Sequence, residues 1–399
     1  MAAREYYYNE SLTRATSTNT TFTASTASIT QAFTNAQKYA IFWCAYIDTA
    51  TTFTGRNKAR LQNVTAGTTI AEINITPEAT TARVSVGGAE LYTGTGVSTQ
   101  IQIQYCSPVG TTTTGLSESS LMIIAVGASD VAAESTGDTA SSSTSYLTKV
   151  STGSFGTAGD YLIVGSAKVL PGASGAPKIQ ITDGTTPLGV VLENDDTSEI
   201  RPYFALRKVT LAAAATHTLD FAVVSGTHTI RNARIFAFRM SGFDNYYWGE
   251  DRTQHTIAAT DGYHDSSCAV SATPQNLVHF IVASGTIADT TGTQATFLAN
   301  KINDGAAGAG TDIGTIFSTI SANVTLPSYS FWIAQRRITP AAAAKTWTTR
   351  YSRTSGTATM GSDEHVLAVL QLDASAVSPT GKNLAFSTGV TPVLSPAGI

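Results

Sequence analysis

The chain has 399 residues, of which 42% are hydrophobic and only 13% are charged, with a formal net charge of −4. This hydrophobic content excludes a disordered chain, and the low charge disfavours a nucleic-acid-binding protein, which needs basic residues to neutralise phosphates. Three cysteines cannot form a disulfide framework, and no apolar run reaches the length of about 18 residues that spans a membrane. The N-terminus lacks the apolar core of a signal peptide, so we expect assembly in a reducing cytoplasm.

Two sequence patterns recur three times along the chain. The first occupies Tyr39–Ile47, Tyr161–Val169 and His279–Ile287, and the second occupies Leu121–Val126, Ala233–Phe238 and Glu364–Val369. Copies two and three share a third run, Tyr203–Leu211 and Trp332–Pro340, each followed by four alanines. Internal duplication predicts an array of similar domains and favours a structural or binding protein over an enzyme.

The repeats divide the chain into seven segments. In order, we expect an N-terminal arm (1–28), copy one (29–133), a Ser/Thr-rich linker (134–145), copy two (146–243), an aromatic junction (244–256), copy three (257–377) and a C-terminal tail (378–399). The length of 399 residues agrees with three domains, each large enough for its own core.

Each copy has the pattern of half-buried strands. Ile101, Ile103 and Tyr105 alternate with polar or small neighbours, and Asp183–Gly184 and Ser225–Gly226 are typical of the turns between strands. Seven or eight such runs per copy predict an all-β fold with three tandem antiparallel β-sandwich domains of the jelly-roll kind. An immunoglobulin-like sandwich is the alternative, because periodicity alone does not separate the two topologies.

No constellation typical of an enzyme is evident, and we expect no catalytic residues, metal or cofactor. The glycines of Gly305–Gly314 lack dinucleotide or P-loop spacing, and Ser174 lacks the nucleophile-elbow pattern. The acidic run 193–199 lacks the spacing of an EF-hand and is interpreted as a solvated loop. The densest acid–base group, interpreted as a polar interdomain loop, comprises Glu250, Asp251, His255, His264 and Asp265.

Two aromatic clusters are the candidate partner-binding residues. They lie in segments expected to be outside strands, where large rings need cover from water. For the N-terminal cluster we favour attachment to a partner protein. For the second cluster we favour packing beneath the adjacent domain, with docking on a protein shell or stacking on a sugar as alternatives. The clusters comprise Tyr6, Tyr7 and Tyr8, and Tyr246, Tyr247 and Trp248. The basic pair Arg336 and Arg337, matched by Arg207 and Lys208, is expected at a solvated strand edge.

The segment Arg207–Met240 resembles the closing strands of jelly-roll domains of the C1q and tumour-necrosis-factor family, and residues 161–184 resemble an opening strand pair. The resemblance covers copy two well, copy three partly and copy one weakly. Domains of this type are frequent in tailed-bacteriophage virion proteins, usually as trimers. The resemblance therefore implies a non-enzymatic structural protein, displayed on the virion surface as head decoration, fibre or spike after assembly in the host cytoplasm.

The implied partners are other virion proteins, namely the major capsid protein or a neighbouring shell component, without nucleic acid or membrane. The alternative function is a carbohydrate-binding adhesin or receptor-binding tail protein, with a host-surface glycan as ligand. Trp332 and Trp347 are its candidate stacking residues, although both fall in strand-like runs that are typical of core. Two assemblies agree with three copies: a homotrimer of chains, or one chain that arranges its own copies as an internal pseudo-trimer.

Overall fold

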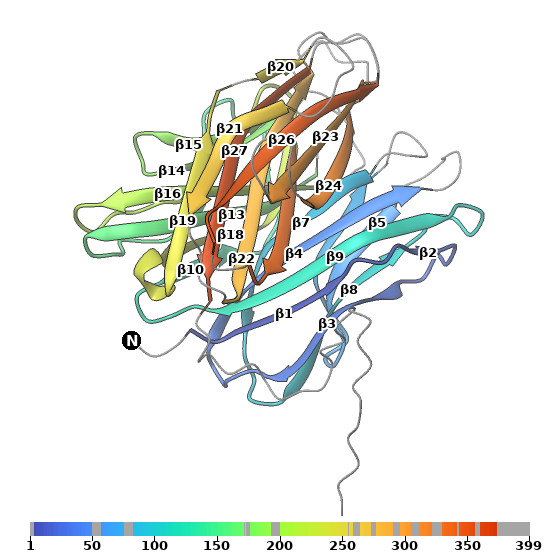
Figure 1. Ribbon diagram of the computed structural model, residues 1–399, viewed down its shortest axis with the longest axis horizontal. Helices are drawn as coiled ribbons and strands as arrows, with labels where there is room; N and C mark the ends of the chain where they lie inside the picture. Colours follow the sequence, from blue (N-terminus) through green and yellow to red (C-terminus); the bar gives the residue numbers. More distant parts are fainter. Residues whose placement is uncertain are drawn as a thin grey trace, which may run out of the picture.

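The computed structural model is built almost wholly from antiparallel β-strands, with one short 3-10 helix, η1 (Met240–Gly242), among the described residues (Figure 1). Six sheets pair into three sandwiches that follow one another along the chain, coloured blue, green and yellow to red in Figure 1. The structure describes residues 4–49, 57–75, 83–170, 172, 176–192, 200–253, 255–257, 264–272, 277–289, 296–304, 311–320, 329–340, 343–355 and 360–372.

Domain 1 has two sheets with the strand orders β1-β9-β4-β7 and β3-β8-β5-β6, and β2 continues the course of β1 along β9. Its strands are β1 (Tyr6–Ser11), β2 (Ala15–Ser17), β3 (Thr23–Ala32), β4 (Lys38–Thr49), β5 (Asn57–Asn63), β6 (Thr68–Ile75), β7 (Arg83–Thr93), β8 (Ser98–Cys106) and β9 (Thr114–Ala125).

Domains 2 and 3 repeat this arrangement strand for strand, with the orders β10-β18-β13-β16 and β12-β17-β14-β15, then β19-β27-β22-β25 and β21-β26-β23-β24. Domain 2 contains β10 (Val131–Ser135), β11 (Thr139–Ser141), β12 (Leu147–Ser151), β13 (Gly159–Leu170), β14 (Pro177–Thr182), β15 (Pro187–Leu192), β16 (Arg201–Leu211), β17 (Thr218–Val223) and β18 (His228–Arg239). Domain 3 contains β19 (Asn245–Asp251), β20 (His255–Ile257), β21 (His264–Ala272), β22 (His279–Asp289), β23 (Thr296–Asp304), β24 (Thr311–Ile320), β25 (Tyr329–Ile338), β26 (Lys345–Ser355) and β27 (Met360–Gln371).

The strand order identifies each domain as a jelly roll. When the interrupted first strand is counted once, each domain pairs its first, eighth, third and sixth strands in one sheet. Its second, seventh, fourth and fifth strands form the other sheet. An immunoglobulin sandwich would instead place its first, second, fifth and fourth strands together. The predicted all-β fold of three tandem sandwiches is therefore confirmed, and its topology is that of the jelly roll.

Each domain starts earlier than predicted, by the first strand in domains 2 and 3, and by the first strand and part of the second in domain 1. The expected arm contains β1, β2 and part of β3, of which β1 and β2 pair with β9. The expected linker contains β11 and part of β10, which pair with β18, and the expected junction contains β19, which pairs with β27. A first strand that pairs with the last strand of its domain depends on a distant partner, which local alternation does not reveal. The expected tail, 378–399, lies outside the described residues.

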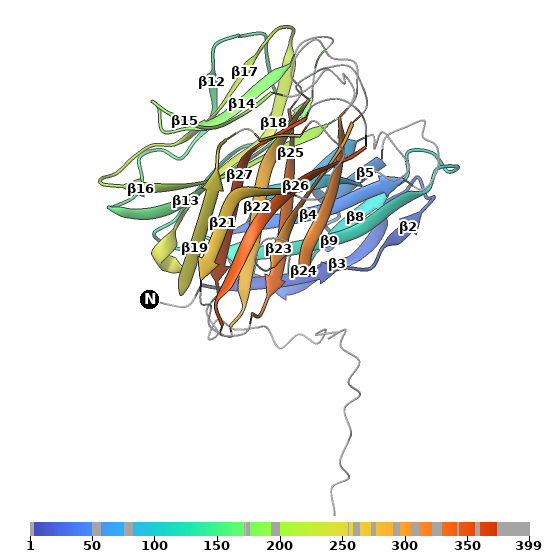
Figure 2. The ribbon, with the colours of Figure 1, turned by 45° about the horizontal axis from the view of Figure 1, so that its top comes forward.

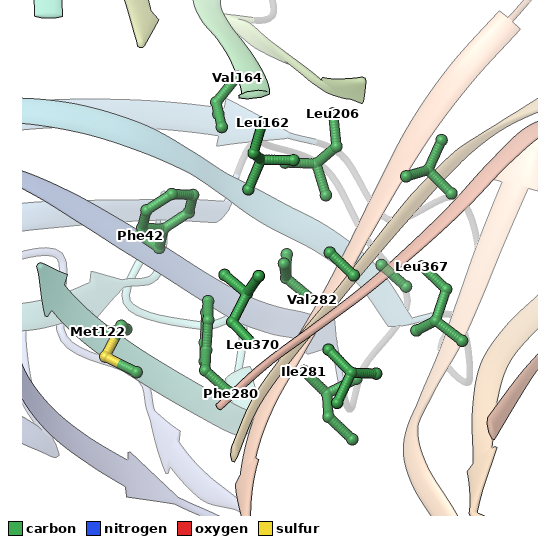
Figure 3. Packing of buried hydrophobic residues seen from close by; sticks show 14 of the residues in the cluster. Phe42, Met122, Leu162, Val164, Leu206, Phe280, Ile281, Val282, Leu367 and Leu370 are labelled. Atoms are coloured by element: carbon green, nitrogen blue, oxygen red, sulfur yellow. The ribbon is translucent and has the colours of Figure 1, made fainter. Parts of the chain in front are cut away.

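The repeated pattern Tyr39–Ile47 is apolar throughout because β4 is buried on both faces. Ile41 and Trp43 point into the sandwich of domain 1, whereas Phe42 and Cys44 point into a second cluster that all three domains share. Figure 3 shows side chains of the three domains converging in this shared cluster, among them Phe42, Leu162, Leu206, Val282 and Leu370. A sheet covered on both faces has continuous hydrophobic strands instead of alternating ones.

Candidate binding surfaces at the domain interfaces

The three domains close a ring around the shared cluster, and the same strand of each domain makes the contact to the next. The sixth strand of domain 1, β7, lies against β13 and β16 of domain 2. In domain 2, β16 lies against β22 and β25 of domain 3, and in domain 3, β25 lies against β4 and β7 of domain 1. The sandwiches accordingly lie around a common centre and not in a line (Figure 2).

Hydrogen bonds tie these strands to the neighbouring domains. The backbone N–H of Ala89 donates to Ser166 Oγ at 3.1 Å, which joins domain 1 to domain 2. Gln335 Nε2 donates to the carbonyl oxygens of Phe42 and Ser120 at 3.3 and 2.9 Å, which joins domain 3 to domain 1. The interfaces therefore combine apolar packing with directional hydrogen bonds between backbone groups and side chains of different domains.

The N-terminal aromatic cluster lies on β1 and packs within the chain. Tyr7 is 5% exposed in the core of domain 1, with its ring 5.4 Å from that of Phe33. Tyr6 and Tyr8 point to the other side and pack against the shared cluster. Tyr8 Oη accepts a hydrogen bond of 3.1 Å from the backbone N–H of Arg337 in domain 3, whose guanidinium lies 5.7 Å from the Tyr8 ring. Burial raises the pKa of Tyr8 well above its usual value.

The second aromatic cluster lies on β19 and makes an analogous contact to domain 2. Tyr246 Oη donates to Asp160 Oδ2 at 2.8 Å, and Lys208 Nζ lies 5.9 Å from the Tyr246 ring. Lys208 and Asp160 also form an ion pair of 3.0 Å. Trp248 is partly buried against the shared cluster, and its Nε1 donates to Glu250 at 3.3 Å.

The two clusters occupy equivalent positions. Tyr6 lies opposite Ile124, which faces Ala40 on the central strand of domain 1. Tyr246 lies opposite Leu370, which faces Phe280, the equivalent residue on the central strand of domain 3. The expectation that both clusters lie outside strands is wrong, because each belongs to the first strand of a jelly roll. The contacts given above are to the chain's own domains, and binding of a separate partner by these residues stays a prediction.

A buried ionic group at each interface was not recognised in the sequence. Between domains 1 and 2, Glu90 Oε1 lies 2.8 Å from Lys168 Nζ, and Glu90 Oε2 lies 2.7 Å from Arg234 Nη1. The side chains of Glu90 and Lys168 are fully buried, and Arg234 is 4% exposed. Burial lowers the pKa of Lys168, and the Glu90 carboxylate opposes that shift.

At the other two interfaces the signs are reversed, because the sixth strand carries an arginine and the neighbouring domain carries the carboxylates. Arg207 of domain 2 pairs with Glu364 of domain 3. Arg336 of domain 3 pairs with Glu10 at 3.1 Å and with Glu118 at 2.9 Å, both in domain 1. The expected solvated edge is thus wrong, since the side chains of Arg207 and Arg336 are 2% and 14% exposed. The match of Arg207 in copy two to Arg336 in copy three was the signal in the sequence that could have identified these interface residues.

The acid–base group predicted near the second junction is partly assembled. Asp251 and His255 lie on β19 and β20, and the His255 ring nitrogen lies 2.5 Å from Asp251 Oδ2. His255 stacks on Tyr351 at 5.2 Å, beside the buried His365. Burial lowers the pKa of His365 to about 3. The side chains of His264 and Asp265 lie outside the described part. Among described residues, no three His, Cys, Asp or Glu side chains gather as a metal site.

Several other predicted positions can be placed. Trp347 is fully buried in domain 3, whereas the side chain of Trp332 on β25 is outside the description. Ser174, residues 193–199 and residues 305–310 of the glycine-rich run also fall outside the described ranges. Within those ranges, no helix has the length and apolar character needed to cross a membrane.

Comparisons with known proteins identify no family. No family model matches the chain, and no curated protein is similar to it in sequence. Solved structures that resemble it include the tandem CBM22 domains of Paenibacillus barcinonensis Xyn10C, at 10% identity, with 60% of this chain and 93% of that chain covered and a TM-score of 0.17.

Two virus structures also resemble the chain. For Sulfolobus Turreted Icosahedral Virus the values are 10% identity, 87% and 84% coverage and a TM-score of 0.20. For the Gx strain of infectious bursal disease virus the identity is 10%, the match covers 88% of this chain and 75% of that chain, and the TM-score is 0.24. Such low TM-scores carry no argument, so the fold assignment rests on strand order alone.

Proposed function

We propose that the chain is a non-enzymatic structural protein of a tailed-phage virion, displayed on the particle surface as a head decoration, fibre or spike. The observation that carries the proposal is the ring itself. Three jelly rolls of one chain bury the outer faces of their first sheets against one another, as in the shared cluster around Phe42, Leu206 and Val282. Such a ring is compact, and its internal packing holds three similar domains in one assembly.

Ring closure also protects strand edges. The sixth strands β7, β16 and β25 are edge strands of their sheets, and unpaired edges promote aggregation, particularly in a protein with few charges. In the ring each of these edges lies against the next domain. Three separate chains achieve the same cover in a homotrimer. We propose that this chain does so alone, as an internal pseudo-trimer, and presents a threefold-like face to the major capsid protein or a neighbouring shell component.

A reconstitution experiment tests this function. The purified chain is mixed with particles of its phage that were assembled without it, and cryo-electron microscopy locates any added density. We expect one chain at each occupied position, on the outside of the particle. Particles that bind no chain, although particles with the native protein carry it, would contradict the proposal.

One observation favours the alternative function of carbohydrate binding. On the outer face of the second sheet of domain 1, the Arg60 guanidinium lies 3.9 Å from the centre of the Phe22 ring. Arg60 also donates to Gln104 Oε1 at 2.8 and 2.7 Å, and Gln104 donates to Gln102 at 3.1 Å. Polar side chains beside one aromatic ring offer the hydrogen bonding and stacking that sugars need. A glycan array with the whole chain, and with Phe22→Ala as control, separates this function from a purely structural one.

A further inference from the structure

We propose that the charges on β7, β16 and β25 specify which domain each of these strands packs against, and so fix the order of the domains in the ring. The surface in question is the sixth-strand edge of each domain, and its partner is one particular neighbouring domain. The inference does not depend on the proposed virion function, because it concerns only contacts within the chain.

The charged residues occupy one equivalent position. Glu90 lies opposite Ile41 on the central strand of domain 1, and Arg207 lies opposite Ile163 in domain 2. Arg336 lies opposite Ile281 in domain 3. The three isoleucines occupy the same place in the repeated pattern. Each jelly roll thus extends one charged side chain from the same point of its sixth strand towards the next domain, but the charge in domain 1 has the opposite sign.

The receiving sites are equivalent in two domains and inverted in the third. In domain 1, Ser120 faces Cys44 of the central strand, and Glu118 lies two residues before Ser120. In domain 3, Val366 faces Ser284 of the central strand, and Glu364 lies two residues before Val366. In domain 2 the equivalent residue of the central strand is Ser166, and Arg234 faces it. Lys168 follows two residues later on the same central strand. Domains 1 and 3 therefore receive with carboxylates, whereas domain 2 receives with two cations.

Charge matching allows one order and opposes the reverse order. In the observed ring, Glu90 meets Lys168 and Arg234, whereas Arg207 and Arg336 meet carboxylates. In a ring with the reverse order, β7 would bring Glu90 against Glu364, and β25 would bring Arg336 against the cations of domain 2. Like charges that cannot be solvated are strongly unfavourable, so two of the three interfaces would oppose closure.

The same rule limits pairing between identical domains of different chains. Two copies of domain 1 would place Glu90 against Glu118, and two copies of domain 2 would place Arg207 against Lys168. Only domain 3, with Arg336 and Glu364, is self-complementary. A chain of three similar domains risks wrong pairing with its neighbours, and this inversion of charge opposes contacts between two copies of domain 1 or two copies of domain 2.

The decisive variant removes the inversion while it keeps each interface complementary. In E90R/K168E/R234Q, all three sixth strands carry arginine and all three receiving sites carry carboxylates. Equal amounts of unlabelled and 15N-labelled chain are refolded together and cross-linked with a short lysine-reactive reagent. Mass spectrometry then scores interdomain links that join the two isotopes. In the wild type we expect interdomain links, within and between chains, to join unlike domains in the observed order, whereas in the variant we expect links of the reverse order and links between two copies of domain 1 or of domain 2 to appear as well.

The opposite result is equally clear. If the variant folds and retains the interdomain link map of the wild type, both within and between chains, the charges stabilise the ring without specifying its order. The exposed pair Lys58 and Glu72, 3.7 Å apart within domain 1, provides a matched control, because K58E/E72K should leave both readouts unchanged.

A second set of variants tests the proposal if the triple variant does not fold. R207E alone places two carboxylates together at the interface between domains 2 and 3, and E364R alone places two cations together there. R207E/E364R restores opposite charges at this interface. It still favours the observed order of the domains, because the reverse order brings like charges together at two interfaces. We expect the double variant to be more stable than either single variant and to keep the native link map. A double variant no more stable than the weaker single variant would overturn the proposal.

Discussion

Phe42 and Trp43 are neighbours on β4 but lie in different cores: Trp43 is buried within the sandwich of domain 1, and Phe42 is buried in the cluster that the three domains share. The Phe42 ring lies 6.4 Å from Phe204 and 6.1 Å from Phe238 of domain 2, and 5.9 Å from Phe280 of domain 3. One side chain thus contacts both neighbouring domains, and stability of the ring is coupled to that of its members.

Phe42→Ala should loosen the ring more than it destabilises any single sandwich. Removal of a buried phenylalanine costs about 3–5 kcal/mol, and here the lost contacts are largely between domains. In calorimetry we expect the wild type to unfold in one thermal transition and Phe42→Ala to unfold in several. Phe33→Ala is the control, because the ring contacts of Phe33 among described residues are to Tyr7, Tyr39 and Tyr92, all in domain 1. If both variants unfold in one transition, the shared cluster does not couple the domains.

Gly88→Ala should separate β7 from domain 2. Gly88 has a φ of +154°, which an alanine rarely adopts, and a Cβ there would lie 2.5 Å from Ser166 Oγ, closer than packed atoms tolerate, and 3.1 Å from Lys168 Nζ. We expect a loss of stability of about 1–3 kcal/mol in urea unfolding, together with faster hydrogen exchange in β7. Gly184→Ala is the matched control, since Gly184 also has a positive φ, of 92°, but its Cβ would meet no atom within 4 Å. Equal stability of the two variants would contradict close contact at this interface.

Acid should destabilise domain 3 through His365. Burial lowers the pKa of His365 to about 3, below the value of 6.5 for an exposed histidine. Between these values the unfolded chain binds a proton that the folded chain does not, so stability falls as pH falls, by at most about 1.4 kcal/mol per pH unit. Burial lowers the pKa of His279 as well, in the same direction.

Unfolding of His365→Gln measured from pH 7 to pH 4 checks this expectation. The variant should show a shallower dependence of unfolding free energy on pH than the wild type. His217→Gln in domain 2 serves as a comparison, because burial also lowers the pKa of His217. Parallel curves for wild type and His365→Gln would show that His365 does not titrate on unfolding.

Tyr246→Phe removes the hydroxyl that donates to Asp160 across the interface between domains 3 and 2. The loss of this hydrogen bond should cost about 1 kcal/mol or somewhat more, because its acceptor is a carboxylate. Denaturant unfolding measures the change, and a Tyr246→Phe/Asp160→Asn double-mutant cycle isolates the coupling between the two residues. Additive effects in the cycle would indicate that the contact contributes nothing to stability.

Deletion of residues 1–20 should unfold domain 1, because it removes β1 and β2 from the sheet that contains β9. Hydrogen exchange should then accelerate in β9 and β4 and remain slower in domain 2. Under the expectation drawn from sequence, the deleted segment is an arm and the domains stay intact. Unchanged protection of β9 in the truncated chain would favour that earlier expectation over the pairing seen in the structure.

The parts of the fold that depend on local pattern were predictable from the sequence. The three central strands were found from Tyr39–Ile47 and its repeats, because burial on both faces makes them continuously apolar. The closing strands were aligned two and three residues out of register, since Leu121, Ile235 and Leu367 are the equivalent residues. Each closing strand has a register shift where it pairs with its central strand. No local signal in the sequence marks the position of these shifts.

The candidate surfaces were predicted less well than the fold. Aromatic rings at Tyr6–Tyr8 and Tyr246–Trp248 were recognised as needing cover, but the sequence could not show that another domain of the chain covers them. Glu90 was missed because copy one matches the other copies weakly at β7, where a carboxylate replaces the arginine of copies two and three. Interdomain ion pairs depend on how the domains pack, which no repeat pattern reveals.

The most direct test of the ring is the mass and shape of the purified chain, measured by light scattering together with small-angle X-ray scattering. The account predicts a monomer of 41.6 kDa. For a compact chain of this length the expected radius of gyration is about 21 Å. An elongated profile with three separated beads, or a particle that forms only as three associated chains, would contradict the claim that one chain closes its own ring.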